Sequence, residues 1–272
     1  METSGHRLWS TVGVAVIFAF YAIPLFLIVI ASFKTNSDVV NNSAALIFTP
    51  TLSAYKAVFT SAFFLALLNS LIIAGGTTLL VLVVATSLAY VLSKTRAAWG
   101  SLVIGVLIAL QMTPAATAVI AQFQVLAVLG QLGSTFGVIL AMSATAVPYA
   151  ILILRPFYLS VPREVEEAAQ VDGSGPFRIF ALIVFPLVRN GVSLIGVLIF
   201  IGAWGEFLYP ISFLNIQGQF PLSVLILQAQ GFYGTQWNSL MALAILGAIP
   251  TIAIFTAVAR RLTSGLMLGV GK

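Results

Sequence analysis

Charged residues are scarce in this sequence, and cysteine is absent. Only 7% of the 272 residues are Asp, Glu, Lys or Arg, whereas soluble domains carry roughly 25%. The lack of cysteine excludes a disulfide framework, a thiol nucleophile and a thiolate metal site. The single histidine, His6, lies in the N-terminal tail and cannot build a metal site or a catalytic triad alone. The sequence therefore predicts no metal site and no catalytic residues.

Hydrophobic residues make up 60% of the chain, and the mean hydropathy is +1.11. No soluble fold has enough interior to bury this much apolar surface. The net charge is +5, but the basic residues stand singly at the ends of apolar runs and form no patch for nucleic acid. The composition predicts an all-α membrane protein that lies in a lipid bilayer and does not bind nucleic acid.

Charged and turn-forming residues divide the chain into stretches long enough to cross a membrane. The uncharged run 97–154 is too long for one crossing at about 1.5 Å per residue, so we divide it at the glycine-bearing turn 130–134. We expect Pro114 to kink the helix before that turn. The polar stretches 34–59 and 215–238 are predicted to be external loops of one membrane domain, 1–272. The six predicted spans are 10–33, 63–92, 102–127, 135–154, 191–214 and 241–259.

The basic residues are distributed unequally between the two sides of this topology. With the N-terminus placed in the cytoplasm, ten of the twelve Lys and Arg residues are cytoplasmic, and only Lys34 and Lys56 are external. This asymmetry follows the positive-inside rule, so we expect an even number of spans and two cytoplasmic termini. The ten residues are Arg7, Lys94, Arg96, Arg155, Arg163, Arg178, Arg189, Arg260, Arg261 and Lys272.

The predicted cytoplasmic stretch 161–190 holds most of the acidic residues. Pro162 suits the first turn of a short helix, and glutamates near a helix N-terminus complement its dipole. Gly173 is expected to end this helix, and Ser174 to cap a second, apolar one. A protruding helix of this kind is typical of a docking element for a soluble partner. A plain amphipathic helix that only connects two spans is the alternative. Four of the chain's seven acidic residues lie here: Glu164, Glu166, Glu167 and Asp172.

The same stretch resembles the EAA loop of bacterial ABC importer permeases, in which Glu-Ala-Ala is followed by Gly and later by Ile-x-Leu-Pro. The spacing agrees throughout, although Phe185 stands where the family usually has leucine, and Asn190 where a second proline often falls. This resemblance implies that the following residues couple the chain to an ATPase: Glu167, Ala168, Ala169, Asp172, Gly173, Ile183 and Pro186.

Three further segments resemble the carbohydrate-uptake permeases, and in particular the shorter permease of maltose-type transporters. They are Asn69-Ser70, the stretch 204–208, in which Gly205 replaces the usual asparagine, and the terminal segment from Gly265. Together with the loop, they cover nearly the whole chain. This resemblance implies a multi-pass protein of the bacterial inner membrane with the type I ABC importer transmembrane fold.

The resemblance also implies partners. The chain would form half of the pathway for a sugar or sugar derivative, next to a second homologous permease in a heterodimer. Two ATPase subunits and an extracytoplasmic sugar-binding protein complete the expected complex. The chain itself is not expected to be an enzyme or to bind a cofactor, because ATP and Mg²⁺ belong on the ATPase. Its only hint of a phosphate loop, Gly-Val-Gly-Lys, has Leu266 where that motif requires glycine.

A second set of candidates concerns the translocation pathway or the binding protein. Glu206 is the one acid outside the tails and the loops, and an ionisable group in or near a span suggests function. Two roles are open for Glu206: it could line the sugar pathway, or it could form a structural contact with a neighbouring helix. We favour the structural role. The candidates are Trp204, Glu206, Phe207, Gln228, Gln230 and Tyr233.

Other functions remain open on the sequence alone. ABC permeases for polyamine, phosphate or glycerol phosphate share the EAA loop, so the loop alone does not distinguish a sugar from these solutes. A secondary transporter would need ionisable groups within its spans, and apart from Glu206 these spans have essentially none. A membrane-bound assembly protein would need no coupling loop.

Overall fold

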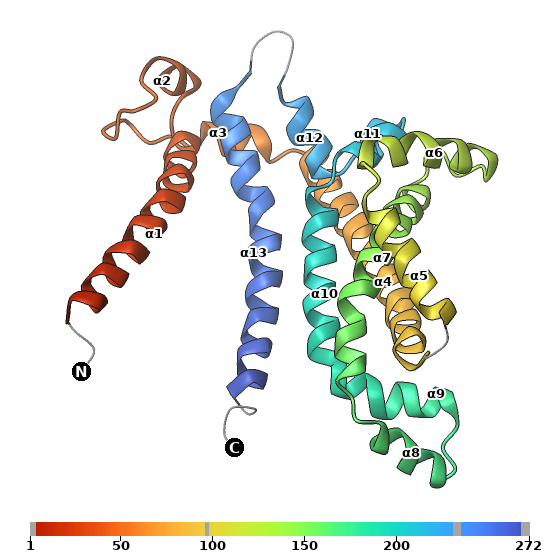
Figure 1. Ribbon diagram of the computed structural model, residues 1–272. Helices are drawn as coiled ribbons and strands as arrows, with labels where there is room; N and C mark the ends of the chain where they lie inside the picture. Colours follow the sequence, from red (N-terminus) through yellow and green to blue (C-terminus); the bar gives the residue numbers. More distant parts are fainter. Residues whose placement is uncertain (1–3, 96–97, 231–234, 268–272) are drawn as a thin grey trace. The chain divides into compact units, whose positions relative to one another are not determined.

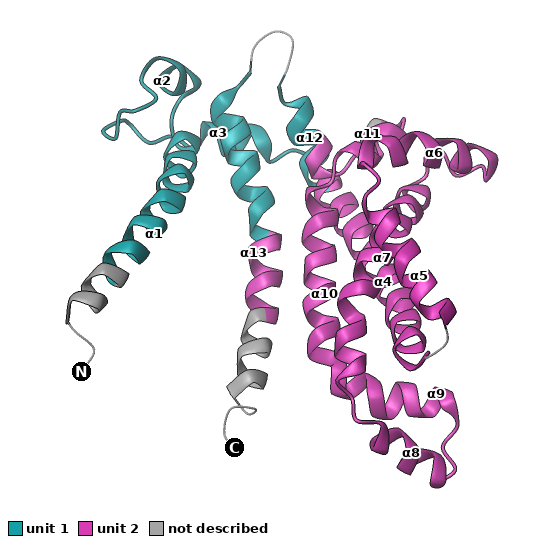
Figure 2. Cartoon of the chain, in the orientation of Figure 1, with its two compact units in different colours: residues 1–64, 225–249 teal, residues 65–224, 250–272 magenta. Residues whose placement is uncertain are grey.

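The computed structural model describes residues 4–95, 98–230 and 235–267, and every regular element within these ranges is a helix (Figure 1). The chain divides into two compact units (Figure 2). Unit 1 comprises residues 1–64 and 225–249, and unit 2 comprises residues 65–224 and 250–272. The helices are α1 (Ser4–Ser32), α2 (Asn36–Asn41), α3 (Ser53–Val58), α4 (Ser61–Lys94), α5 (Ala98–Gln111), α6 (Ala115–Val128), α7 (Thr135–Leu159), α8 (Arg163–Val171), α9 (Pro176–Arg178), η1 (Ile179–Val184), α10 (Phe185–Gly205), α11 (Leu208–Phe213), η2 (Gln217–Gln219), α12 (Leu222–Gln228) and α13 (Trp237–Met267).

Unit 1 joins the end of α1 to the loop that follows it and to the first turn of α13. The Ser32 hydroxyl lies 2.8 Å from the Tyr55 hydroxyl. The Asn36 side-chain oxygen accepts a hydrogen bond from the backbone N–H of Trp237, and the Asn238 amide donates to the Lys34 carbonyl. The last two contacts pair backbone groups at or next to helix ends, which would otherwise lack a partner.

Unit 2 has one continuous apolar core, in which α7 packs against both α5 and α10. Small side chains allow the helices to approach closely. A Cβ added at Gly191 of α10 would lie 2.5 Å from the ring of Phe157 on α7, so only glycine fits this contact. The same core extends to Val161 and Ala169, and it therefore includes one face of α8.

Within the part of the chain that the structure describes, five helices are long and apolar enough to cross a membrane, or six if one bent pair is counted as a span. The bent pair is α5 and α6. The direction of the chain bends by 104° between them, at residues 112–114. Pro114 has no N–H and disfavours helical geometry at the residue before it, so the helix stops there. The predicted span 102–127 is therefore two helices of 14 residues each, and the expected kink is a full break.

The predicted span 191–214 also differs from the structure. An unbroken helical stretch runs over Pro176–Gly205, with Pro176 at its first turn, where the missing N–H costs nothing. Residues 179–184 form a π-helix, and Figure 1 shows α9 running crosswise to α10. Insertions of this kind redirect a helix. The second half of the predicted loop 161–190 is thus the beginning of this helix.

Candidate functional site

Helix α8 is the short acidic helix that the sequence predicts after Pro162. Pro162 stands directly before the first helical residue, Arg163, with φ −59° and ψ 137°. Glu164 and Glu166 occupy the first turn, where the exposed N–H groups favour negative charge. Helix α8 is therefore stabilised locally at the end that carries its acids.

The C-terminal end of α8 is closed by a Schellman motif. Gly173 has φ +80°, which a residue with a Cβ adopts only at a cost. Its N–H donates to the Gln170 carbonyl at 3.0 Å, and the N–H of Ser174 donates to the Ala169 carbonyl at 2.9 Å. These are the two hydrogen bonds of that motif. The Asp172-Gly173 pair thus ends α8 and reverses the chain.

Helix α8 has one buried and one exposed face. Glu166 and Ala169, three residues apart, are buried, whereas Glu167 and Ala168 are exposed. Val171, at the end of the helix, is 88% exposed. Residues three apart share a face of a helix, so the structure holds α8 by one side and leaves the Glu167 side available.

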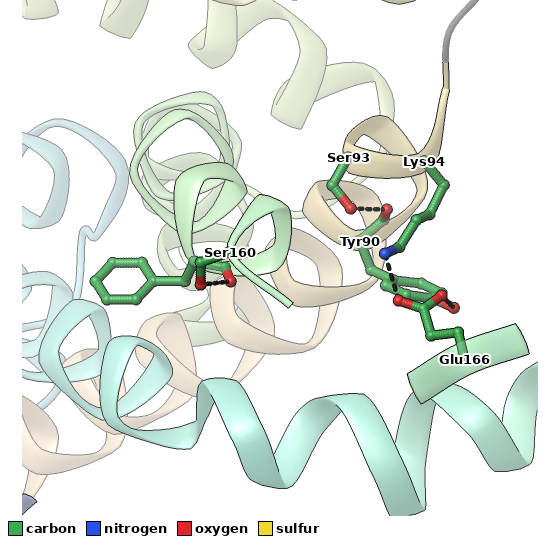
Figure 3. Close-up of polar contacts among 6 residues, drawn as sticks. Tyr90, Ser93, Lys94, Ser160 and Glu166 are labelled. Atoms are coloured by element: carbon green, nitrogen blue, oxygen red, sulfur yellow. Dashed lines mark hydrogen bonds and ion pairs between the residues drawn. The ribbon is translucent and has the colours of Figure 1, made fainter. Parts of the chain in front are cut away.

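Glu166 is tied to the end of α4 by two partners (Figure 3). Its carboxylate forms an ion pair with the ammonium of Lys94, and it accepts a hydrogen bond of 3.1 Å from the Tyr90 hydroxyl. The Tyr90 ring lies 5.1 Å from that of Phe180 in η1. Glu166 is only 7% exposed, so its charge needs these partners. The Tyr90–Lys94–Glu166 cluster therefore connects α8 to a long apolar helix.

Sequence reasoning missed this cluster. In the sequence, Lys94 is a charge at the end of an apolar run and Glu166 is one of the four acids of the loop, and nothing pairs the two. The signal was available, because Glu166 precedes the apolar Ala169 by three residues and so shares its buried face. The pairing with Lys94, 72 positions away in the sequence, was not predictable from local pattern.

A groove of about 470 Å³ runs between the end of α4 and α8. It brings charges of both signs together, because acidic and basic side chains line it side by side. The lining residues are Tyr90, Val91, Lys94, Thr95, Arg163, Glu166, Glu167 and Gln170. The predicted residue Glu167 thus borders an open, polar surface.

The remaining predicted coupling residues lie beyond the turn. Asp172 is exposed at the end of α8, Ile183 is half-buried within η1, and Pro186 is exposed near the start of α10. Ile183 packs against the same apolar core as Ala169. The core therefore links α8 to the segment that begins α10.

The second predicted set is spread over both units. In unit 2, Trp204 stacks on Phe200 with ring centroids 5.7 Å apart, and Phe207 is 46% exposed. Glu206 is half-buried, and its Oε1 accepts a hydrogen bond of 2.7 Å from the N–H of Leu208. In unit 1, the side chains of Gln228 and Gln230 are exposed. Tyr233 lies outside the described residues.

A model of one protein family matches residues 81–267, which is more than half of the chain and includes α8 and its partners on α4. The family is described as the inner membrane component of binding-protein-dependent transport systems. The chain belongs to this family. The resemblance read from the EAA loop is thereby confirmed, as is the prediction of a multi-pass inner membrane protein.

Curated relatives match this chain along most of its length. It is 29% identical to a probable ABC transporter permease of Sinorhizobium fredii, with 100% of this chain and 97% of the relative covered. It is 29% identical to the glucose import system permease of Saccharolobus solfataricus, with 95% and 93% covered. A sulfoquinovosyl glycerol transport system permease of Agrobacterium fabrum is 30% identical, with 81% and 78% covered.

Solved structures agree with the helical fold. A chain of a bacterial ABC transporter that imports the acidic polysaccharide alginate superimposes with a TM-score of 0.81 at 20% identity, covering 96% of this chain and 98% of that one. A chain of the MetNI methionine ABC transporter gives a TM-score of 0.61 at 16% identity, with 76% and 99% covered. The predicted all-α membrane fold of the importer permeases is confirmed.

Proposed function

We propose that this permease carries a sugar or sugar derivative through the inner membrane and that α8 couples it to a separate ATPase. The observation that carries this proposal is the division of α8 into two faces. One face is fixed to α4 and to the core of unit 2 through Glu166 and Ala169, and the other presents Glu167 and Ala168. A helix held in this way transmits a push from a docked partner to the spans.

The topology proposed from charge places α8 in the cytoplasm. The basic residues Lys94, Arg155 and Arg163 lie at or near the ends of α4, α7 and α8 in unit 2, and positive charge collects on the cytoplasmic side. Both termini are then cytoplasmic, and an ATPase in that compartment reaches α8. This chain supplies no ATPase activity of its own in this scheme.

A second permease subunit is the proposed neighbour of this chain in the membrane. The span Thr11–Ser32 has none of its apolar window buried within the chain, so its surface is available to lipid or to another subunit. Two ATPase subunits and an extracytoplasmic binding protein complete the proposed complex. The alginate transporter is described in complex with a substrate-bound periplasmic protein, which supports this composition.

Sugar as the cargo is supported by the relatives. Permeases for glucose, sulfoquinovosyl glycerol and diacetylchitobiose all match the chain. A permease for sn-glycerol-3-phosphate from Shigella flexneri also matches, at 30% identity over 75% of this chain. Carbohydrate permeases predominate in this group, so a glycoside is the cargo we propose.

The test is co-purification of the ATPase with charge-reversed permeases. Glu167→Arg should abolish association and uptake, because it reverses the charge of the exposed face while leaving Glu166 and Ala169 in place. The stability of the permease should change little, since an exposed charge contributes about 0–1 kcal/mol. Lys56→Glu, an equal and opposite reversal at an exposed residue of unit 1, is the matched control and should retain the ATPase. Normal association and uptake with Glu167→Arg would refute the coupling role.

A further inference from the structure

Unit 2 contains a cavity of about 390 Å³ that none of the EAA-loop residues touches. This volume falls in the range of roughly 300–1,000 Å³ typical of small-molecule sites. Five helices, α4, α5, α7, α10 and α11, contribute to its walls, together with Glu206 between α10 and α11. The lining residues are Thr77, Gln111, Met142, Thr145, Ala146, Tyr149, Leu198, Ile199, Gly202, Ala203, Glu206 and Tyr209.

The walls combine apolar surface with a connected set of hydroxyl and amide groups. The hydroxyls of Thr145 on α7 and Tyr209 on α11 lie 2.9 Å apart. The Gln111 amide of α5 donates to the Thr145 carbonyl at 3.3 Å. The Gln122 amide of α6, which is not among the lining residues, donates to the Thr145 hydroxyl at 3.0 Å. Polar groups from several helices thus converge on one wall, in the manner of a site that orients a ligand.

One threonine that lines the cavity has a hydroxyl without a hydrogen-bond partner among the described residues. Thr77 on α4 is 1% exposed, and its Oγ1 forms no hydrogen bond within the described residues. The next residue, Thr78, instead bonds back to the Ala74 carbonyl at 2.7 Å. A buried hydroxyl left unpaired costs free energy, so this wall of the cavity holds a polar group whose hydrogen bonding is unsatisfied.

The charge of the cavity is negative. Glu206 contributes a carboxylate, of which Oε1 is held by the Leu208 N–H, and no cationic side chain stands among the described residues that line the cavity. An anion in this partly apolar space would face Glu206 without a countercharge. Hydroxyl groups, by contrast, bond to carboxylate, amide and hydroxyl partners alike.

We propose that this cavity is a binding site of this subunit for an uncharged, hydroxyl-rich solute such as a neutral glycoside, and that Glu206 disfavours anionic ones. The inference rests on the proposed function and narrows its cargo. One fold neighbour belongs to an importer of the acidic polysaccharide alginate, and one relative is named as a permease for sn-glycerol-3-phosphate. The residues that line the cavity of this chain favour an uncharged solute instead.

Gly202 offers a way to fill the cavity without disturbing the fold. Gly202 lines the cavity and a Cβ added there meets no atom within 4 Å, so the first atom of the side chain in Gly202→Leu has room. Gly105 on α5 has equal room for a Cβ and does not line the cavity. Gly105→Leu is therefore the matched control. Glu206→Gln removes the charge and keeps an acceptor for the Leu208 N–H.

The experiment measures solute binding by calorimetry to the intact transporter complex in nanodiscs, without the binding protein. The probes are maltotriose, cellobiose and diacetylchitobiose, with a galacturonate trimer as the anionic member. At least one neutral probe should bind, and the galacturonate trimer should bind about tenfold more weakly or worse, a difference of about 1.4 kcal/mol. Gly202→Leu should weaken neutral binding by a similar factor, Gly105→Leu should not, and Glu206→Gln should reduce the discrimination against the anion.

Three results would overturn the inference: binding of the galacturonate trimer as tight as that of the neutral probes, binding unaffected by Gly202→Leu, or no binding of any neutral probe. A complex that still assembles with the ATPase and takes up solute in that case leaves the proposed function standing. A complex that fails to assemble with an ATPase or to transport any solute overturns both.

Discussion

Among the residues whose burial the structure describes, each unit contains one buried charge, and the two are held in different ways. Lys34 in unit 1 is 1% exposed, and its ammonium donates to the carbonyls of Asn42 and Ser43 at 3.0 Å each. It also lies 5.3 Å from the centre of the Phe48 ring. Glu166 in unit 2 is bound by Lys94 and Tyr90, which belong to a different helix.

The difference lies in how far apart in the sequence the partners are. Every partner that the described residues offer the Lys34 side chain is within 14 positions of it, so this charge organises a single loop. The partners of Glu166 are 72 and 76 positions away. Breaking these two contacts therefore releases α8 from α4. We infer that Lys34 shapes a local structure, whereas Glu166 carries force between α8 and α4.

The largest expected effect comes from breaking the Glu166 pair. Lys94→Met leaves the Glu166 carboxylate buried without its cation, and the loss of one partner of a buried pair costs about 3–5 kcal/mol. We expect a lower midpoint of thermal unfolding for the purified complex and fewer solute molecules transported per ATP. Both quantities are measured in the same reconstituted preparation.

The control for this variant removes both charges. The double variant Lys94→Met with Glu166→Gln leaves no unpaired ion, so it should recover much of the lost stability. Its transport per ATP should remain below that of the wild type, because the link to α4 is weaker. A double variant as unstable as Lys94→Met alone would contradict the pairing.

Replacing Lys34 should have a smaller and different effect. Lys34→Met removes the ammonium that donates to the Asn42 and Ser43 carbonyls. Both residues are exposed, so water can replace the donor, and the loss is that of a hydrogen bond to a charged group, about 1.5–3 kcal/mol. The unfolding midpoint should fall, but the solute transported per ATP should be unchanged. A loss of coupling as large as that from Lys94→Met would remove the distinction between the two buried charges.

Gly173 tests whether the turn after α8 matters for coupling. Gly173→Ala forces a Cβ into the left-handed region, at a cost of about 1–2 kcal/mol. We expect weaker ATPase binding, measured by the fraction of ATPase that co-purifies. Gly175→Ala is the control, because that glycine has φ −73° and space for a Cβ. Equal losses from the two variants would show that backbone geometry at Gly173 is not the cause.

The smallest effect is expected from Tyr90→Phe. This change removes the hydroxyl that donates to Glu166 and retains the ring that contacts Phe180. One hydrogen bond contributes about 0.5–1.5 kcal/mol, so the unfolding midpoint should fall slightly and transport should persist. A drop as large as that caused by Lys94→Met would show that Tyr90, rather than the ion pair, holds Glu166.

Much of the fold was predictable, because long apolar runs in a chain with little charge have few other solutions. The helix after Pro162 and its end at Gly173 were also predictable, since proline, first-turn glutamates and a glycine act within a few residues. The exposed position of Glu167 and the buried position of Ala169 follow from the same short helix.

Other features depend on partners that the sequence does not show. The break at Pro114 was expected only as a kink, because a bend of 104° depends on what packs on either side. The π-helix at residues 179–184 follows from tertiary packing rather than from a local motif. The polar wall around Thr145 and Tyr209 joins residues 64 positions apart, so no local pattern reveals it.

The absence of cysteine permits a direct measurement of where the ATPase lies. Ala168→Cys introduces a single thiol on the exposed face of α8, which is labelled with a photoreactive maleimide in the assembled complex. Lys56→Cys in unit 1 provides the matched label. The coupling role predicts a photoadduct between the permease and the ATPase subunit from position 168 and none from position 56. No ATPase adduct from position 168, or equal yields from both positions, would contradict it.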